Sequence, residues 1–158
     1  MGSSAGSYGA DAGSKLNFAF RVRYRTDNPL KRLQGQVTVT FVKDGRTYQF
    51  KSTILQSLGI AFQTPGGEAC EGPSSPACLG RADVRSASNL HDITDRKVPI
   101  YLGGNFSLEV TFADGGGRGP GDSIGITVWN GRTLLFSSEW NGAQTLEKAL
   151  NGGNVVVR

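Results

Sequence analysis

The two cysteines are the most reactive side chains in this sequence, and they lie eight positions apart. The residues between Cys70 and Cys78 include one glycine and two prolines, which turn a chain back on itself and bring the two sulfur atoms within reach. We therefore expect a disulfide, which would stabilise the fold by about 2–3 kcal/mol and would persist only in an oxidising compartment. Two unpaired thiols are the alternative. Zinc is not expected, because His91 is the only histidine and two thiolates do not complete a tetrahedral site.

Two aspartates enclose the most glycine-rich stretch of the chain. Asp114 and Asp122 flank residues 115–121, five of which are glycine. Carboxylate and backbone carbonyl oxygens are the ligands that Ca²⁺ prefers, so a calcium site is a hypothesis here. Arg118 opposes it by charge, and aspartates that simply end two strands are the alternative.

Aromatic and basic side chains offer two kinds of binding surface. Three aromatic residues fall outside the main hydrophobic alternation and could stack on a sugar ring: Tyr48, Tyr101 and Trp140. Three arginines share one face of the first predicted strand and form a positive ridge suited to phosphates, glycans or an acidic cell surface: Arg21, Arg23 and Arg25. Ordinary core packing and a solvated strand face are the alternatives. Nucleic acid is not expected as a partner, because no DNA- or RNA-binding motif accompanies the arginines.

Catalysis has little support in the sequence. His91 precedes Asp92, but no Gly-x-Ser-x-Gly elbow or Cys–His signature accompanies them, so we expect no enzyme and rank a hydrolase last. An amide crosslink between Lys15 and Asn154, with Glu109 handling protons, is conceivable if the first and last strands are neighbours. The alternation turns Glu109 toward solvent, which argues against it.

Hydrophobic residues alternate with polar ones from residue 15 onward, which is the pattern of strands with one buried face. Asp44-Gly45 and Asn130-Gly131 are the residue pairs that tight hairpin turns favour, and the latter predicts a type I′ turn. A helical turn is predicted over 143–150 and a last strand over 154–157. About nine short strands predict an all-β antiparallel β-sandwich, with a closed β-barrel as the alternative. The predicted core contains Phe18, Phe20, Val22, Val37, Val39, Phe41, Phe50, Phe106, Leu108, Val110, Ile124, Ile126, Val128 and Trp129.

Length and composition favour one folded unit. The chain has 158 residues, 37% of them hydrophobic and 19% charged, and no apolar run approaches the length of a membrane helix. We expect residues 1–13 to be a flexible leader or expression scar and residues 14–158 to form one β-sandwich domain. The net charge of +4 is scattered along the chain, so it does not by itself imply an acidic partner.

Four segments together carry a resemblance: residues 13–20, 33–37, 121–129 and 152–157. In their order they resemble a β-rich terminal module of secreted and cell-surface bacterial proteins, which often follows immunoglobulin-like or polycystic-kidney-disease-like repeats. The resemblance implies export, a β-sandwich and a non-catalytic accessory or attachment role, with a cell-surface component, a glycan or a protein as partner. It implies no cofactor and no catalytic residues, and the segment with the two cysteines departs from it. A carbohydrate-binding module and a self-assembling, homo-oligomeric structural subunit are the alternatives.

Overall fold

The computed structural model describes residues 2–3, 8–24, 32–64, 68–70, 78–115 and 121–150. Within these residues the chain forms nine strands and no helix: β1 (Gly2–Ser3), β2 (Lys15–Tyr24), β3 (Leu33–Lys43), β4 (Arg46–Gln63), β5 (Leu79–Asp92), β6 (Ile100–Asp114), β7 (Ser123–Asn130), β8 (Thr133–Ser137) and β9 (Lys148–Ala149). Each strand from β1 to β8 pairs antiparallel with the next one along the chain, and β9 pairs with β7. The predicted all-β antiparallel class is confirmed.

Two hairpins appear where the sequence predicts them. Asp44 and Gly45 join β3 to β4 with φ of 51° and 73°, the left-handed conformation that both residues of a type I′ turn need. The second hairpin has Asn130 paired with Thr133, so Gly131 and Arg132 form its loop. Of these two residues only Gly131 has a positive φ, 58°, which is the pattern of a type II′ turn. The hairpin is therefore confirmed, and the predicted type I′ turn is wrong.

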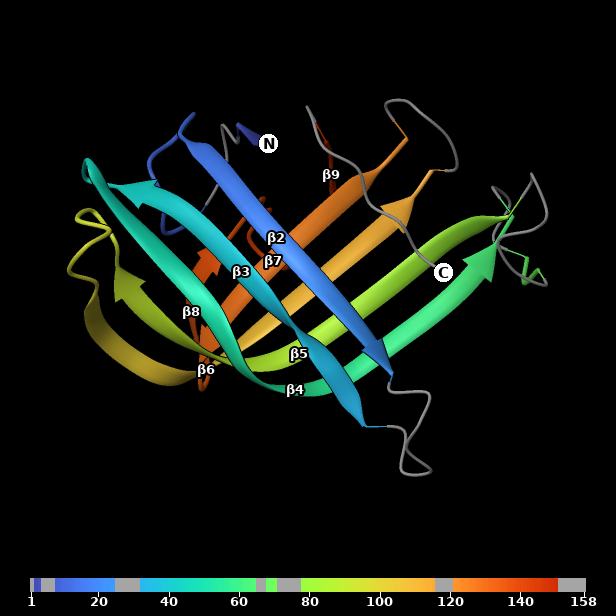
Figure 1. Ribbon diagram of the computed structural model, residues 1–158. Helices are drawn as coiled ribbons and strands as arrows, with labels where there is room; N and C mark the ends of the chain where they lie inside the picture. Colours follow the sequence, from blue (N-terminus) through green and yellow to red (C-terminus); the bar gives the residue numbers. More distant parts are fainter. Residues whose placement is uncertain are drawn as a thin grey trace.

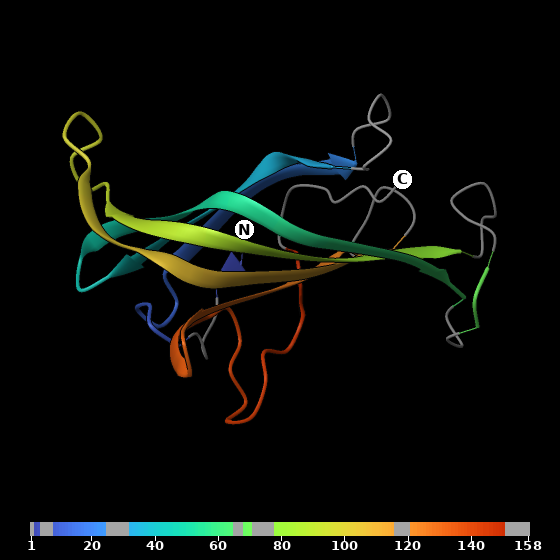
Figure 2. The ribbon, with the colours of Figure 1, turned by 90° about the horizontal axis from the view of Figure 1, so that it is seen from below.

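The sheet folds over to form two facing layers. β2 and β3 cross over β6 and β7 (Figure 1), and the turned view places β4 and β5 between these two pairs (Figure 2). The bend lies in β4, whose pairing with β5 shifts register between Ser52 and Ile54 and again between Leu55 and Ser57. Bulges of this kind turn the corner in sandwiches whose strands cross.

Aromatic rings join the layers across the fold. Phe20 of β2 stacks on Phe112 of β6 at 4.3 Å between ring centroids, and Phe41 of β3 lies 4.8 Å from Phe136 of β8. The described residues of β2 and β8 share no backbone pairs, so the sheet is not closed and the barrel alternative is wrong. The result is a sandwich made from one continuous sheet.

The core largely follows the predicted alternation. Nine predicted core residues are buried: Val37, Val39, Phe41, Phe50, Leu108, Val110, Ile124, Ile126 and Val128. Four more are half-buried against them: Phe18, Phe20, Val22 and Phe106. Trp129 is the exception, because its neighbour Val128 occupies the inner face and alternation turns the indole to the outer one.

The helix predicted over 143–150 is wrong. Residues 139–150 instead run across the outer face of β7, where a bridge joins Trp140 to Thr145 and β9 pairs with the start of β7. The Thr145 hydroxyl lies 2.6 Å from that of Thr127, and Glu147 accepts a hydrogen bond from Ser123 at 2.7 Å. These long-range contacts hold the segment extended, so they outweigh its weak local preference for helix. The strand predicted over 154–157 lies outside the described residues.

Part of the predicted leader makes defined contacts with the sheet. Tyr8 and Ser137 exchange two backbone hydrogen bonds of 2.9 Å, and the Asp11 amide donates to the Val42 carbonyl at 2.8 Å. The Asp11 carboxylate accepts a hydrogen bond of 2.9 Å from the Asp44 amide in the β3–β4 turn. We call residues 8–11 the N-terminal strap, because they run from β8 to this turn. The described part of the chain contains no helix of the length and apolarity needed to cross a membrane.

Candidate functional site

One cross-strand row defines the end of the sandwich at which the β3–β4 and β5–β6 hairpins lie. Phe41 pairs with Tyr48, Tyr48 with Asp92, and Asp92 with Ile100, so one residue from each of β3 to β6 faces the inside of the fold. Along this row Phe41 is buried, Asp92 forms an ion pair with Arg46, and Ile100 is exposed. Candidate binding surfaces lie on both sides of this ion pair.

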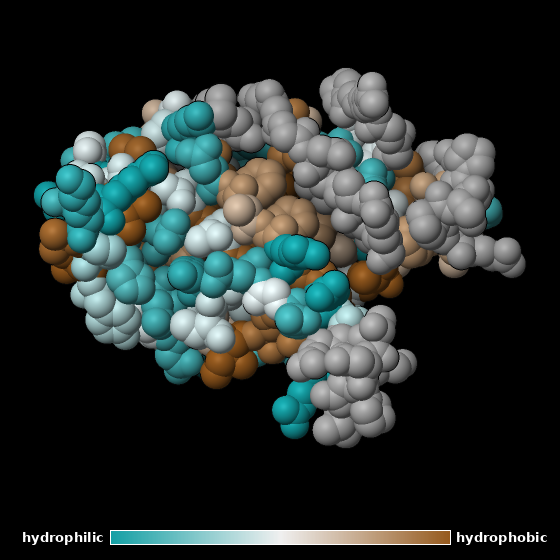
Figure 3. Space-filling view, in the orientation of Figure 1, coloured by the Kyte–Doolittle hydropathy of each residue, from teal (hydrophilic) through white to brown (hydrophobic). Residues whose placement is uncertain are grey.

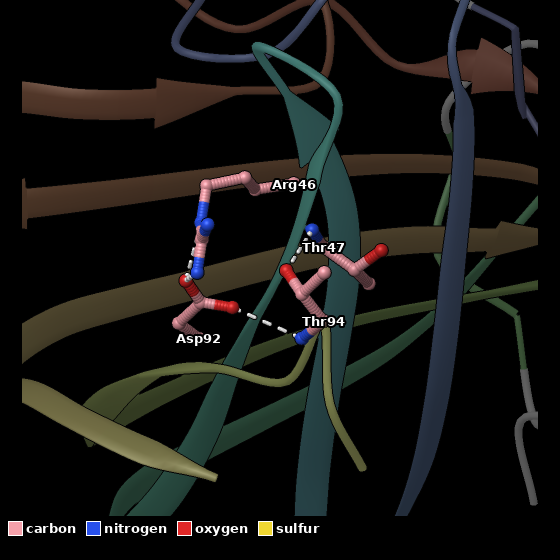
Figure 4. Close-up of polar contacts among 4 residues, drawn as sticks. All are labelled: Arg46, Thr47, Asp92 and Thr94. Carbon is pink, nitrogen blue, oxygen red and sulfur yellow. Dashed lines mark hydrogen bonds and ion pairs between the residues drawn. The ribbon is translucent and has the colours of Figure 1, made fainter.

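The ion pair anchors the β5–β6 hairpin (Figure 4). Asp92 is buried, and its Oδ2 accepts a hydrogen bond of 2.7 Å from Nε of Arg46 and forms an ion pair with Nη2 at 2.7 Å, while its Oδ1 accepts a hydrogen bond of 2.9 Å from the Thr94 amide. The Thr94 hydroxyl in turn accepts a hydrogen bond of 3.0 Å from the Thr47 amide. The first residues of the loop are therefore fixed to β4.

The same contacts favour the charged form of Asp92. Hydrogen bonds from Thr94, supported by the hydrogen bond and charge of Arg46, lower the pKa of this carboxyl from 3.8 to about 2. The carboxylate in turn raises the pKa of Arg46 above its usual value. Asp92 therefore stays ionised throughout the physiological range and acts as a structural anchor.

An open hollow lies on the β3 side of the ion pair. Its volume is about 320 Å³, and five of its lining residues are aromatic or aliphatic: Phe41, Tyr48, Phe50, Leu90 and Leu135. Lys43, Asp44 and the strap residue Gly9 complete the lining. The Phe41 ring stacks with those of Tyr48 and Phe50, at 5.6 and 5.4 Å between centroids. Of the predicted ligand-binding residues that the structure describes, only Tyr48 lines this hollow.

An exposed apolar surface lies on the β6 side of the ion pair. Val98, Ile100, Tyr101 and Leu102 are 62%, 50%, 60% and 49% exposed, and we call these four residues the apolar tip. They account for four of the nine large hydrophobic side chains that are exposed among the described residues. Figure 3 shows hydrophobic surface on the side of the molecule where the β5–β6 hairpin lies.

Tyr101 also belongs to a polar cluster on the outer face. Its ring meets that of His91 edge to face at 5.6 Å, and His91 pairs with Gln49 of β4. The Tyr101 hydroxyl and the Asn89 amide oxygen converge above Gly104, where a side chain would displace them. An exposed ring is thus surrounded by groups that donate and accept hydrogen bonds.

The remaining predicted ligand-binding residues lie elsewhere. Trp140 is half-buried and meets Trp129 edge to face at 6.0 Å on the outer face of β7, so it covers the sheet. Arg21 and Arg23 are both exposed on β2, as the alternation predicts, and Arg23 donates to Gln34 at 3.5 Å. Arg25 lies outside the described residues. The structure therefore separates Tyr48, Tyr101 and Trp140 into three different surroundings.

The structure describes only the two ends of the predicted calcium loop. Asp122 is buried, its Oδ1 accepts a hydrogen bond of 3.1 Å from the Gly115 amide, and its carbonyl accepts one of 2.9 Å from Leu150. Asp114 is half-buried and pairs with Gly80 at the end of β6. No group of three or more metal-binding side chains occurs among the described residues, and residues 116–120 lie outside them. Asp122 has a structural role as the residue that joins the two ends of the loop, and calcium stays a hypothesis.

The predicted disulfide is confirmed, because Cys70 and Cys78 are bonded to each other with 6.1 Å between their Cα atoms. The histidine and aspartate considered for hydrolysis do not face each other. His91 and Asp92 are adjacent on β5 and point to opposite faces, and Arg46 and Thr94 occupy the Asp92 carboxylate. Glu109 lies 3.5 Å from Arg85 on the outer face, and Asn154 is outside the described residues, so the crosslink stays untested.

Comparison of the chain with protein-family models, curated proteins and solved structures finds no match. The site must therefore be interpreted from its own residues. The hollow could not have been identified from the sequence, because its lining comes from the strap, β3, β4, β5 and β8. The apolar tip had a signal in the run Val98-Pro99-Ile100-Tyr101-Leu102, which breaks the alternation of apolar and polar residues.

Proposed function

We propose that this chain is a non-catalytic binding module of an extracellular bacterial protein, and that it attaches to a protein partner through the apolar tip. The observation that carries this proposal is the exposure of the tip itself. Four large apolar side chains within five consecutive positions are 49–62% exposed. Ile100 and Tyr101 lie on opposite faces of β6, so the tip exposes apolar side chains on both sides of the hairpin. Large exposed apolar side chains gathered in this way mark interaction sites on soluble proteins.

The surroundings of the tip support a protein partner. Tyrosine and aliphatic residues are typical of the centre of protein interfaces, and charged residues of their rim. Here Arg96 and Lys97 precede the apolar run and are exposed. The contacts of Asp92 with Arg46 and Thr94 hold the base of the hairpin, so little ordering is needed when the tip binds.

The disulfide and the sequence resemblance support an extracellular location. A bond between Cys70 and Cys78 is compatible with an oxidising compartment and would be reduced in most cytosols. The resemblance to terminal modules of secreted bacterial proteins implies the same location and an accessory role.

A selection against displayed peptides tests the tip. The immobilised chain is used to select binders from a displayed peptide library, with Ile100→Asp as the test variant. Ile54→Asp is the matched control, because Ile54 is 65% exposed on β4, away from the tip. We expect peptides rich in apolar residues that bind the wild type and the Ile54 variant and bind Ile100→Asp at least tenfold more weakly. Selected peptides that bind all three proteins equally would refute the proposal.

Carbohydrate binding is a second candidate, favoured by the exposed Tyr101 ring beside His91 and Asn89. Aromatic faces stack on sugar rings, and the neighbouring imidazole and amide can bind hydroxyl groups. A glycan array at physiological salt distinguishes it from protein binding. Reproducible signals that Tyr101→Ala abolishes and Trp140→Ala leaves unchanged would favour a sugar ligand. An array without signals, together with selected peptides, would favour a protein.

Self-association through the tip is tested in the same samples. Light scattering measures the mass of the wild type and of Ile100→Asp over a hundredfold range of concentration. A mass that rises in the wild type alone would identify a second copy of the chain as the partner.

A further inference from the structure

We propose that the hollow beside Tyr48 is a binding site for a small aromatic compound that carries one anionic group. The site is separate from the apolar tip and does not rest on the function proposed for it. The inference comes from how the hollow is built, what lines it and which charged groups surround its opening.

The N-terminal strap forms one wall of the hollow. The strap is fixed at one end by the paired hydrogen bonds of Tyr8 with Ser137, and at the other by Asp11 on the β3–β4 turn. Between these anchors Gly9 has a φ of 80° and lies directly against the carbonyl of Leu135, where no Cβ could fit. A backbone without a side chain therefore forms this wall, and the space is left open.

The lining is suited to a ring. Phe41 and Phe50 are almost fully buried, whereas Tyr48 and Leu90 are half-buried, so apolar surface remains accessible above a packed aromatic base. A volume of about 320 Å³ lies at the small end of the range for ligand sites, which is roughly 300–1,000 Å³. Stacked or edge-to-face contacts with the Phe41–Tyr48 pair would orient a planar ligand.

The charged residues around the opening indicate that the group attached to the ligand's ring is anionic. Two charged residues line the hollow, Lys43 and Asp44. Arg46 and Asp92 pair with the lining residues Lys43 and Tyr48, and the Asp11 carboxylate accepts hydrogen bonds from the Asp44 and Gly45 amides. Arg46 and Asp92 neutralise each other at 2.7 Å. Lys43 lies two residues beyond Phe41 on the same face of β3, and its ammonium forms no ion pair or hydrogen bond with the described residues. Asp44 sits in the exposed turn itself. A carboxylate attached to a ring in the hollow would therefore meet Lys43.

The experiment follows amide chemical shifts while probes are added to 5 mM. Indole-3-acetate is the anionic probe, indole the neutral one and tryptamine the cationic one. Ligands of about 12 non-hydrogen atoms reach dissociation constants in the range of roughly 0.1–5 mM. We expect saturable shifts at Gly9, Tyr48 and Leu135, with binding strongest for the anion and weakest for the cation.

Two variants test whether the ligand's ring lies in the hollow, and a third tests whether its anionic group contacts Lys43. Leu90→Trp fills the hollow and Tyr48→Ala removes part of its wall, so each should weaken all three probes at least fivefold. Lys43→Gln should weaken indole-3-acetate by about two- to fivefold and leave indole unchanged, because exposed ion pairs contribute little. Lys51→Gln, on the outer face of β4, is the matched control and should change nothing.

Three results would overturn the proposal. The first is the absence of concentration-dependent shifts at Gly9, Tyr48 and Leu135 up to 5 mM in a protein whose spectrum shows it to be folded. The second is binding that neither Leu90→Trp nor Tyr48→Ala weakens, because the probe would then lie elsewhere. The third is a preference for tryptamine, which would assign the charge contact to Asp44. Loss of peptide binding in Ile100→Asp bears only on the tip, so the two proposals fail separately.

Discussion

Phe136 provides the sharpest test of the folded-over sheet. Its ring lies 4.8 Å from that of Phe41 and 6.2 Å from that of Phe50, although β8 is five strands away from β3 in the sheet order. In a flat sheet these strands would be about 24 Å apart, given about 4.8 Å for each strand step. The contact exists only because the two layers face each other, so substitution at this position measures the cohesion between them.

The expected cost is large because the side chain is only 1% exposed. Phe136→Ala should lower the free energy of unfolding by about 3–5 kcal/mol, and the milder Phe136→Leu by about 1–3 kcal/mol. With a urea slope of about 2 kcal/mol/M, the alanine variant should unfold at roughly 2 M less urea. The intrinsic fluorescence of the two tryptophans reports the transition. Thr133→Ala, exposed on the same strand, should stay within about 0.5 kcal/mol of the wild type.

A double-mutant cycle of Phe136→Leu with Phe41→Leu isolates the contact between the layers. We expect a coupling of about 0.5–1.5 kcal/mol, the range for aromatic pairs. A cost below about 1 kcal/mol for Phe136→Ala, or a coupling indistinguishable from zero, would refute the argument that the layers are joined through these rings.

Three further predictions concern pH, the disulfide and the strap. Since Asp92 has a pKa of about 2 in the folded chain and about 3.9 in the unfolded one, the unfolded state binds its proton first. Its stabilising contribution is therefore complete above about pH 5 and is lost as the pH falls toward 2, and Asp92→Asn should remove this part of the acid dependence of the urea midpoint. Replacing Cys70 and Cys78 together with serine should cost about 2–3 kcal/mol in the same assay, whereas a loss below 0.5 kcal/mol would contradict the chain-entropy argument. Gly9→Ala should lower stability by about 1–3 kcal/mol, because it strains a positive φ and meets the Leu135 carbonyl. An unchanged midpoint would show that the strap does not hold this position.

The features that the sequence predicted correctly depend on neighbouring residues. Asp44-Gly45 supplies the two left-handed residues of a type I′ turn, and alternation along β3 places Val37, Val39 and Phe41 on one face. The Cys70–Cys78 bond likewise follows from a short separation containing glycine and proline. In each case the physical cause lies within about ten residues of chain.

The features that the sequence did not predict depend on distant residues. Thr145 belongs to an extended segment because hydroxyl groups of Thr127 and Ser137 lie 2.6 and 2.7 Å from its own, and no local pattern announces these partners. The hollow needs Gly9 to meet β8, more than a hundred positions along the chain. Tyr101 and Trp140 are both predicted ligand contacts, but only the structure shows that Tyr101 is exposed and that Trp140 packs against Trp129 and covers the sheet.

Because the bend in β4 depends on two register shifts, insertion or deletion of residues in this part of β4 should change the angle between the two layers. From Ser52 to Ser57 the strand advances five residues while its partner β5 advances three, from Ser88 to Arg85, so β4 carries two extra residues through the bend. Two residues are one full period of a strand, and Phe50 before the bend and Leu58 beyond it are therefore both buried. Loss of both extra residues would straighten the corner and preserve every inward side chain. Loss of one would place the remainder of β4 on the wrong face. Relatives that differ in layer angle should therefore differ here by an even number of residues.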